Sequence, residues 1–86
     1  MPKLILMGSI QQYAGGLSSA EVEGASARAA IASLEKAYPA LKGWVADEQG
    51  TLRQHVKLFR GGRAVTLDAE LGPTDELYIV AAISGG

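Results

Sequence analysis

The chain has 86 residues, of which 48% are apolar and 20% are charged, and its formal net charge is −1 at pH 7. A chain of this length is expected to form a single domain over residues 1–86. The near-neutral charge argues against nucleic-acid binding driven by phosphate contacts, and the absence of cysteine excludes disulfides, thiolate nucleophiles and iron–sulfur clusters.

Metal sites and membrane spans are not expected either. The single histidine, His55, offers no cluster of ligands, so we expect no metal site and no intrinsically bound cofactor. The apolar run near the N-terminus is interrupted at Gly8 and is too short for a membrane span. It also lacks the features of a secretory signal. We therefore expect no membrane association and a cytoplasmic location.

The N-terminal part of the chain predicts two strands. Residues 3–7 are rich in Leu and Ile and stop at Gly8, which is typical of a buried strand that is too short to be a helix. Gly15 and Gly16 then break a polar stretch. Residues 17–24 indicate a return strand, with Leu17 and Val22 as its apolar positions. The two strands are expected to form a hairpin with a long, flexible connection.

One helix is predicted from Ser26 to about Tyr38, because apolar residues recur there at spacings of three and four and so share one face. The residues of this face are Ala27, Ala30, Ile31, Leu34 and Tyr38. Ser26 is a suitable N-cap, since its hydroxyl can accept a hydrogen bond from an otherwise unpaired amide. Pro39 opposes continuation of the helix.

The segment that follows the helix is less regular. Leu41, Trp44 and Val45 are expected to close over the core, and Trp44 is interpreted as core or rim packing rather than as a stacking platform for a ligand. Residues 47–50 contain two acids, a Gln and a Gly, which predict an exposed turn.

Three strands are predicted in the second half of the chain. Residues 52–60 alternate buried-type positions at Val56 and Leu58 with outward positions, which include His55. Residues 64–67 predict a short strand after a tight Gly-Gly turn, and residues 76–83 predict a final strand rich in β-branched and aromatic side chains. His55 has no acid or nucleophile near it in sequence, so it is interpreted as a surface residue and not as an acid–base catalyst.

These elements together predict an α+β fold of the β-grasp, or ubiquitin-like, kind. A mixed sheet of four to five strands would pack on one main helix, with the first and last strands central and adjacent. This arrangement buries the apolar face of the helix and of each strand in a short chain.

The end of the chain is the strongest functional feature. The predicted final strand leads directly into Ser84, Gly85 and Gly86, which we interpret as a flexible tail over residues 84–86 with an exposed terminal carboxylate. Glycine has no Cβ, so such a tail can pass through a narrow channel in a partner enzyme. A carboxylate must be activated before acyl transfer, and the chain has no phosphate-binding loop of its own, so another protein would supply the nucleotide chemistry. The alternative interpretation is that the two glycines simply fray into solvent, as chain ends do.

The sequence resembles the ubiquitin-like sulfur-carrier family over nearly its whole length. The resemblance rests on the segments "AGG", "IASLEKAYPAL", "LRQHVKLFRGG" and, most specifically, "DELYIVAAISGG". That family includes the small subunit of molybdopterin synthase, the carrier of the thiamine pathway and a carrier used in cysteine biosynthesis.

The resemblance implies a chemistry and a set of partners. An E1-like adenylating enzyme would use ATP to activate the carboxylate of Gly86, and a sulfur donor would convert it to a thiocarboxylate. Gly85 would be the slim residue that enters the active sites of partners, and Ser84 would begin the arm. The acceptor would be a cysteine synthase-like enzyme or a molybdopterin synthase large subunit-like enzyme, or the sulfur would serve tRNA thiolation. The chain itself would be a carrier and not an enzyme.

One strand face is a candidate docking surface for the activating enzyme. If Val56, Leu58, Leu77 and Ile79 point to the helix, then alternation places Lys57, Phe59, Tyr78 and Val80 on the opposite face. Aromatic and apolar residues that are exposed together are typical of an interface, and the charges of Lys57 and nearby Arg60 would orient the partner. Alternatively, Phe59 and Tyr78 are a cross-strand pair that stabilises the sheet and contacts no partner.

Two other classes of function remain open. The activated Gly86 of a ubiquitin-like modifier would form an isopeptide bond with a lysine of another protein. A noncovalent β-grasp binding module would not use the tail at all, and the near-neutral charge argues against RNA as its partner.

Overall fold

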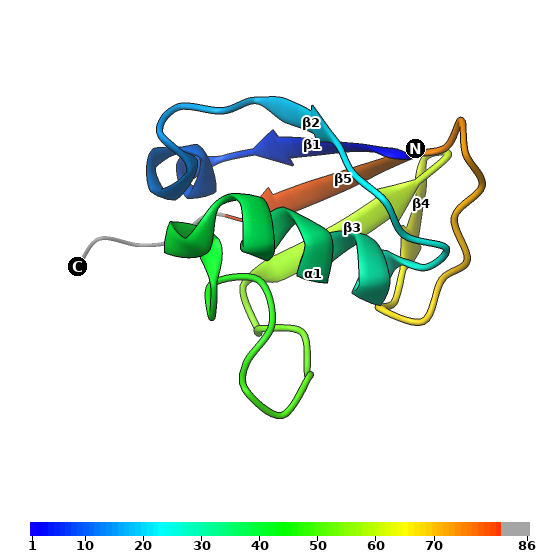
Figure 1. Cartoon of the computed structure of the whole chain (residues 1–86). Coiled ribbons are helices and arrows are strands. Elements are labelled where there is room, and N and C mark those ends of the chain that lie inside the picture. Colours follow the sequence, from blue (N-terminus) through cyan, green and yellow to red (C-terminus); the bar gives the residue numbers. More distant parts are fainter. Residues whose placement is uncertain (82–86) are drawn as a thin grey trace.

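The computed structural model of the chain describes residues 1–81 (Figure 1). The elements in chain order are strand β1 (Lys3–Met7), 3-10 helix η1 (Ser9–Ala14), strand β2 (Ser19–Glu21), helix α1 (Ala27–Ala37), 3-10 helix η2 (Pro39–Leu41), and strands β3 (Val56–Arg60), β4 (Arg63–Val65) and β5 (Glu76–Ala81). Within residues 1–81, no helix is long and apolar enough to cross a membrane.

The strands form one mixed sheet, in the order β2-β1-β5-β3-β4. The first and last strands are central and run parallel, with Leu4 opposite Leu77 and Leu6 opposite Ile79. The other neighbouring pairs are antiparallel. Figure 1 shows α1 lying across one face of this sheet. The predicted architecture, a mixed sheet on one main helix, is therefore confirmed.

Helix α1 begins and ends where the sequence predicts. The Ser26 hydroxyl accepts a hydrogen bond from the Ala29 N–H at 3.1 Å, which satisfies one of the free amides of the first turn. The Tyr38 N–H donates to the Leu34 carbonyl at 2.8 Å, and Pro39 then starts η2. The predicted apolar face is buried at Ala27, Ala30, Ile31 and Leu34, while Tyr38 is only half-buried.

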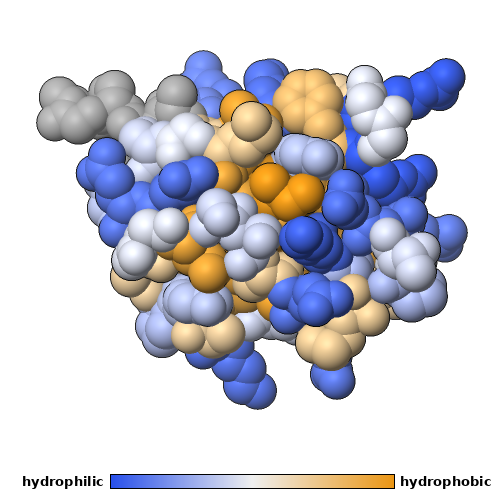
Figure 2. Space-filling model, turned by 90° about the horizontal axis from the view of Figure 1, so that it is seen from above, coloured by the Kyte–Doolittle hydropathy of each residue, from blue (hydrophilic) through white to orange (hydrophobic). Residues whose placement is uncertain are grey.

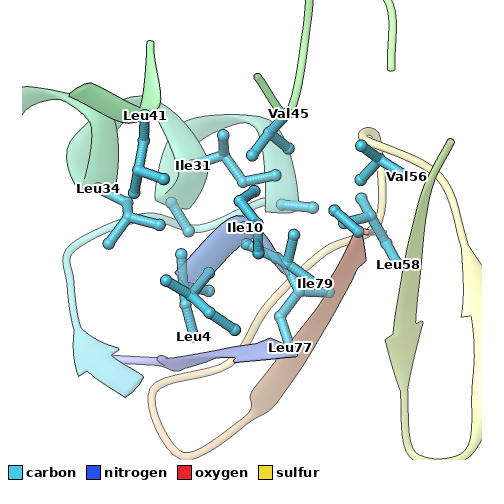
Figure 3. Packing of buried hydrophobic residues seen from close by; sticks show 14 of the residues in the cluster. Leu4, Ile10, Ile31, Leu34, Leu41, Val45, Val56, Leu58, Leu77 and Ile79 are labelled. Atoms are coloured by element: carbon cyan, nitrogen blue, oxygen red, sulfur yellow. The ribbon is translucent and has the colours of Figure 1, made fainter. Parts of the chain in front are cut away.

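The core lies between α1 and the sheet. Leu4, Leu77 and Ile79 from the central strands are fully buried, and Figure 3 shows them facing the helix. Leu41 and Val45 are also fully buried, as predicted, and Trp44 is half-buried at the rim. The described residues include no buried polar side chain. Hydrophobic burial between the two layers is therefore what holds α1 against the sheet.

The connection after β1 differs from the prediction of a long, flexible loop. Residues Ser9–Ala14 form the 3-10 helix η1, whose Ile10 is fully buried in the middle of the core cluster in Figure 3. The Gln11 side-chain amide also donates to the Leu6 carbonyl at 2.7 Å. The buried side chains of Ile10 and Ala14 and the bond back to β1 give this mainly polar stretch a fixed structure.

The strand predicted over residues 52–60 begins later, at Val56. The Val56 N–H donates to the Arg53 carbonyl at 3.0 Å, which closes a turn before the strand. His55 is therefore an exposed turn residue and not a strand residue, while Leu52 makes only an isolated bridge with Ala46. The prediction that His55 is a surface residue is confirmed.

The short strand predicted over residues 64–67 is Arg63–Val65 instead. The chain leaves the sheet there because residues 67–69 cap the start of α1. The carbonyls of Leu67 and Ala69 accept hydrogen bonds from the Arg28 and Ala27 amides at 2.9 and 2.8 Å. The free amides of a helix N-terminus need such partners, so Leu67 lies in a turn with its side chain buried.

The burial of Ile79 predicts a large effect on stability. Ile79→Ala is expected to lower the free energy of unfolding by about 2–5 kcal/mol, because it removes a fully buried side chain and leaves a cavity between β5 and α1. Val80→Ala, one position along on the half-exposed face, is the control and should cost clearly less. Urea unfolding midpoints measure both. Equal losses for the two variants would contradict this assignment of faces.

Candidate functional site

Strand β5 carries the chain from the sheet centre to the predicted C-terminal arm. It lies between β1 and β3, and Val56 of β3 pairs with Ala81 at its end. Because β1 and β5 are parallel, they end at the same edge of the sheet, next to η1 (Figure 1). The predicted arm residues Ser84, Gly85 and Gly86 lie outside the described residues. What the structure defines is the base from which they depart.

The four predicted docking residues lie together on the face of the sheet that is opposite α1. Phe59 pairs with Tyr78, and Lys57 pairs with Val80 across the β3–β5 ladder. Phe59, Tyr78 and Val80 are half-buried and Lys57 is exposed, whereas their neighbours Leu58, Leu77 and Ile79 are buried. The alternation predicted from the sequence is confirmed. A stabilising cross-strand pair of Phe59 and Tyr78 and a docking surface would both show this arrangement. The arrangement does not distinguish them, so the docking role stays a prediction.

The structure adds two residues of β1 to this face that the sequence analysis did not identify. Ile5 pairs with Tyr78 and Met7 pairs with Val80 in the parallel ladder. Ile5 is half-buried and Met7 is 46% exposed. The alternation of Leu4 and Leu6 with Ile5 and Met7 is visible in the sequence. This alternation assigns Ile5 and Met7 to the same surface as Tyr78 and Val80 only once the pairing of β1 with β5 is known.

We call this surface the sheet patch and define it by its apolar members. They are Ile5, Met7, Phe59, Tyr78 and Val80. The patch runs along β5 to the edge of the sheet where the strand ends. Figure 2 shows a different side of the molecule, seen from above, where hydrophobic residues lie in the middle of the view with polar residues around them. Apolar side chains exposed as a group are typical of an interaction surface.

The charges near the sheet patch come from different elements. Lys57 is exposed beside Val80, which separates it from Met7 on the other side of β5. Arg60, which the sequence analysis placed beside Lys57 as an orienting charge, instead donates a hydrogen bond to the backbone carbonyl of Glu70. Lys57 is thus the better placed of the two to meet an acidic group of a partner.

An aromatic pair lies at the same end of the molecule as the departure of the arm. The rings of Tyr13 in η1 and Trp44 are stacked, with centroids 4.3 Å apart and planes at 27°. Both side chains are half-buried and pack against the core cluster. This confirms Trp44 as rim packing. The pair stabilises the position of η1 beside the end of β5.

One pocket lies on the helix side of the molecule, away from the sheet patch. It has a volume of ≈ 550 Å³, and its lining includes charged residues of both signs, among them Arg28, Glu35, Lys42 and Arg53. Partial burial raises the pKa of Glu35 above its usual value, although the Gly43 amide and the charge of Lys42 act in the opposite direction.

Within residues 1–81, no group of three or more His, Cys, Asp or Glu side chains is placed to hold a metal ion.

Sequence comparison identifies relatives over most of the chain. A sequence model of the ThiS family matches residues 4–86, which include Gly85 and Gly86. The chain is also 35% identical over 57 residues to small archaeal modifier protein 1 of Haloferax volcanii, an alignment that covers 66% of each protein.

Structural comparison gives the same grouping. The crystal structure of SAMP1 from Haloferax volcanii superposes with a TM-score of 0.84 at 28% identity and covers 99% of this chain and 98% of the other. CysO from the Amycolatopsis orientalis BexX/CysO complex superposes with a TM-score of 0.85, covering 100% of both chains. At 23% identity the second likeness shows the shared fold.

The match to the family covers nearly the whole chain, and the observed sheet order and helix are those of its structural neighbours. Members of this family are small proteins of the ubiquitin-like β-grasp fold that act as carriers or modifiers. The chain belongs to the ThiS family of ubiquitin-like sulfur-carrier and modifier proteins.

Proposed function

We propose that this protein is a sulfur carrier that works through the carboxylate of Gly86. A partner E1-like enzyme adenylates this carboxylate with ATP, and sulfur from a donor then replaces AMP to give a thiocarboxylate. The observation that carries the proposal is the family match, which covers residues 4–86 and therefore includes Gly85 and Gly86. The carrier itself would bind no cofactor, and we expect it to work in the cytoplasm.

Chemistry requires the two steps in this order. A free carboxylate is a poor electrophile, and the adenylate supplies a good leaving group. In the adenylate, the Gly86 acyl carbon is bonded to an oxygen of the AMP phosphate. Attack by hydrosulfide (HS⁻), which the donor releases, forms a C–S bond and breaks the C–O bond to AMP, so that AMP and a proton leave and the thiocarboxylate remains. The product passes its sulfur to an acceptor in the synthesis of cysteine, of molybdopterin or of a thiolated tRNA.

The sheet patch is the proposed contact for the activating enzyme. Its five apolar side chains lie on one flat face, and the strand that contributes Tyr78 and Val80 leads toward the arm. A partner docked on this face would hold β5 close to its own active site. The acceptor enzyme would also act on the arm that continues from β5. It would be either cysteine synthase-like or like the large subunit of molybdopterin synthase. No direct contact with nucleic acid or membrane is part of the proposal.

A second function is favoured by one of the relatives. The chain is 35% identical to a small archaeal modifier protein over 57 residues. A modifier would transfer the activated Gly86 acyl group to the amine of a lysine, with loss of AMP and formation of an isopeptide bond. Conjugates of higher mass in extracts of the source cells, absent when Gly86 is deleted, would favour this function. A thiocarboxylate on the free protein favours the carrier.

The adenylation step is shared by both functions and is tested first. The purified chain, its activating enzyme and ATP are expected to give pyrophosphate release that depends on the chain and a protein–AMP adduct at Gly86. Tandem mass spectrometry of the C-terminal peptide locates the adduct. An active enzyme that forms no adduct with this chain would count against the carrier and against the modifier.

A further inference from the structure

Gly8 is the first residue after β1, at the edge of the sheet where β5 also ends. Its backbone has φ 96° and ψ −167°, a conformation that is essentially restricted to glycine. A residue with a side chain at this position would be strained even in open space.

The space around Gly8 is not open. A Cβ built on Gly8 would overlap the backbone carbonyl oxygen of Ala81 and lie 3.0 Å from the carbonyl carbon. These are main-chain atoms of the last described strand residue, so they cannot turn aside as the end of a flexible side chain would. Any side chain at position 8 must displace either the end of β5 or the start of η1.

Both of these segments are held in place. Ala81 is fully buried and pairs with Val56, and the residue before it pairs with Met7. On the other side, the Gln11 N–H donates to the Gly8 carbonyl at 3.3 Å, and Ile10 is fully buried. Gly8 therefore fills a gap between two anchored segments that has room for a backbone only.

Ala81 is also the last described residue of β5, five residues before Gly86. We infer that Gly8 is a positioning residue for the C-terminal arm. By having no side chain, it allows the Ala81 carbonyl to lie against the end of β1 and so fixes the place and direction from which the arm departs. The inference rests on the proposed function, because the origin of the arm affects activity only if Gly86 is the reacting end.

Gly8→Ala tests this inference, and Gly24→Ala is its matched control. Gly24 has φ 156°, and a Cβ there would lie 2.5 Å from the Ala30 amide nitrogen in α1. Both variants thus force a side chain against a backbone at positive φ. Only Gly8 does so next to the end of β5. A general loss of stability is therefore expected in both variants, whereas an effect on the arm is expected only in Gly8→Ala.

The expected kinetic result is a fall in kcat without a matching change in KM. For Gly8→Ala, kcat for adenylation, corrected for the folded fraction, should fall by roughly tenfold or more, since small misplacements of a reacting group have effects of this size. KM should stay close to that of the wild type because the sheet patch is unchanged. Gly24→Ala should retain the wild-type kcat per folded molecule. A wild-type kcat for Gly8→Ala would reduce Gly8 to a structural glycine and overturn the inference.

A second readout does not depend on the activating enzyme. In NMR spectra, Gly8→Ala is expected to shift the amide resonances of residues 81–86, and Gly24→Ala is expected to leave them in place. If the wild type is not adenylated, the proposed function fails, yet these spectra still show whether Gly8 sets the position of the arm. Unshifted resonances in a folded Gly8→Ala variant would overturn the inference by themselves.

One further variant covers the case in which Gly8→Ala does not fold. Insertion of one glycine directly after Ala81 leaves every described residue unchanged and lengthens the arm by about 3.3–3.6 Å. If the departure point is fixed and matters, kcat should fall in this variant too. An unchanged kcat would show that activation is indifferent to where the arm starts, and the inference would be wrong.

Discussion

Deletion of Gly85 and Gly86 is expected to abolish adenylation of the protein while leaving its stability unchanged. The shortened chain still has a terminal carboxylate, now on Ser84, but this group lies about 7 Å short of its former reach, given roughly 3.3–3.6 Å for each extended residue. Reacting atoms must come within about 3–3.5 Å in a productive complex. The truncated arm therefore cannot deliver its carboxylate to the nucleotide.

Stability should not change, because the described strand ends at Ala81 and the deleted residues follow it. Pyrophosphate release measures adenylation, and a urea unfolding curve checks the fold. Gly86→Ala keeps the length of the arm and the carboxylate and adds only one methyl group, so it should retain more activity than the deletion. Full activity of the truncated protein in cells would favour a noncovalent binding module, in which the arm has no chemical role.

The double variant Tyr78→Asp/Val80→Asp is expected to raise KM for the activating enzyme by at least roughly 30-fold. Central residues of an interface contribute about 2 kcal/mol or more to binding, and about 1.4 kcal/mol corresponds to a factor of ten. Both positions are half-exposed on the outer face of β5, and two carboxylates there would oppose burial in an apolar interface. The value of kcat should change little, because the arm and its base are intact.

Ala29→Asp/Ala32→Asp provides the matched control for the added charge. It introduces the same two carboxylates at exposed positions of α1, away from the sheet patch. Its KM should stay near the wild-type value. If the Tyr78/Val80 variant is folded and keeps the wild-type KM, the patch does not dock the enzyme. Phe59 and Tyr78 would then be a cross-strand pair that contributes only about 0.2–1 kcal/mol to the sheet.

The two kinetic signatures separate the parts of the proposed site. A variant of the sheet patch is expected to act on KM, because it weakens binding before the chemistry. A variant of Gly8 is expected to act on kcat, because the bound protein presents its carboxylate badly. Removal of the two glycines should eliminate the reaction altogether. These differences assign docking, positioning and chemistry to separate residues of a single small domain.

Much of the fold was predictable because its signals are local. The spacing of Ala27, Ala30, Ile31 and Leu34 fixes the buried face of α1, and Ser26 marks its start. Alternation along residues 56–60 and 76–81 assigns Val56 and Leu77 to the core and Lys57 and Tyr78 to the other face. The repeat of 3.6 residues in a helix and of 2 residues in a strand follows from backbone geometry, so both can be recognised in a single sequence.

The features that the sequence did not reveal depend on contacts between distant segments. The strand predicted over residues 52–60 includes residues 52–55, but a strand needs a partner, and the ladder of β3 with β5 begins only at Val56. Leu67 leaves the sheet because its carbonyl caps α1, about forty residues earlier in the chain. The mainly polar stretch of η1 gains its structure from contacts with the rest of the fold, among them the burial of Ile10 and Ala14.

The candidate site shows the same division. The arm and the outward positions of β3 and β5 can be predicted from the sequence. Ile5 and Met7 belong to the sheet patch only because of the parallel register of β1 with β5. The role inferred for Gly8 has no sequence signal beyond the glycine itself. It depends on the approach of Ala81, a residue more than seventy positions away, to the end of β1.

Intact-mass spectrometry of the protein purified from its source cells tests the carrier function. We expect a fraction of molecules with the mass gain of one carboxyl oxygen exchanged for sulfur, which maps to Gly86 and reacts with alkylating reagents selective for thiocarboxylates. An unmodified carboxylate on Gly86 throughout, in cells that contain the competent activating enzyme and sulfur donor, would contradict the carrier function.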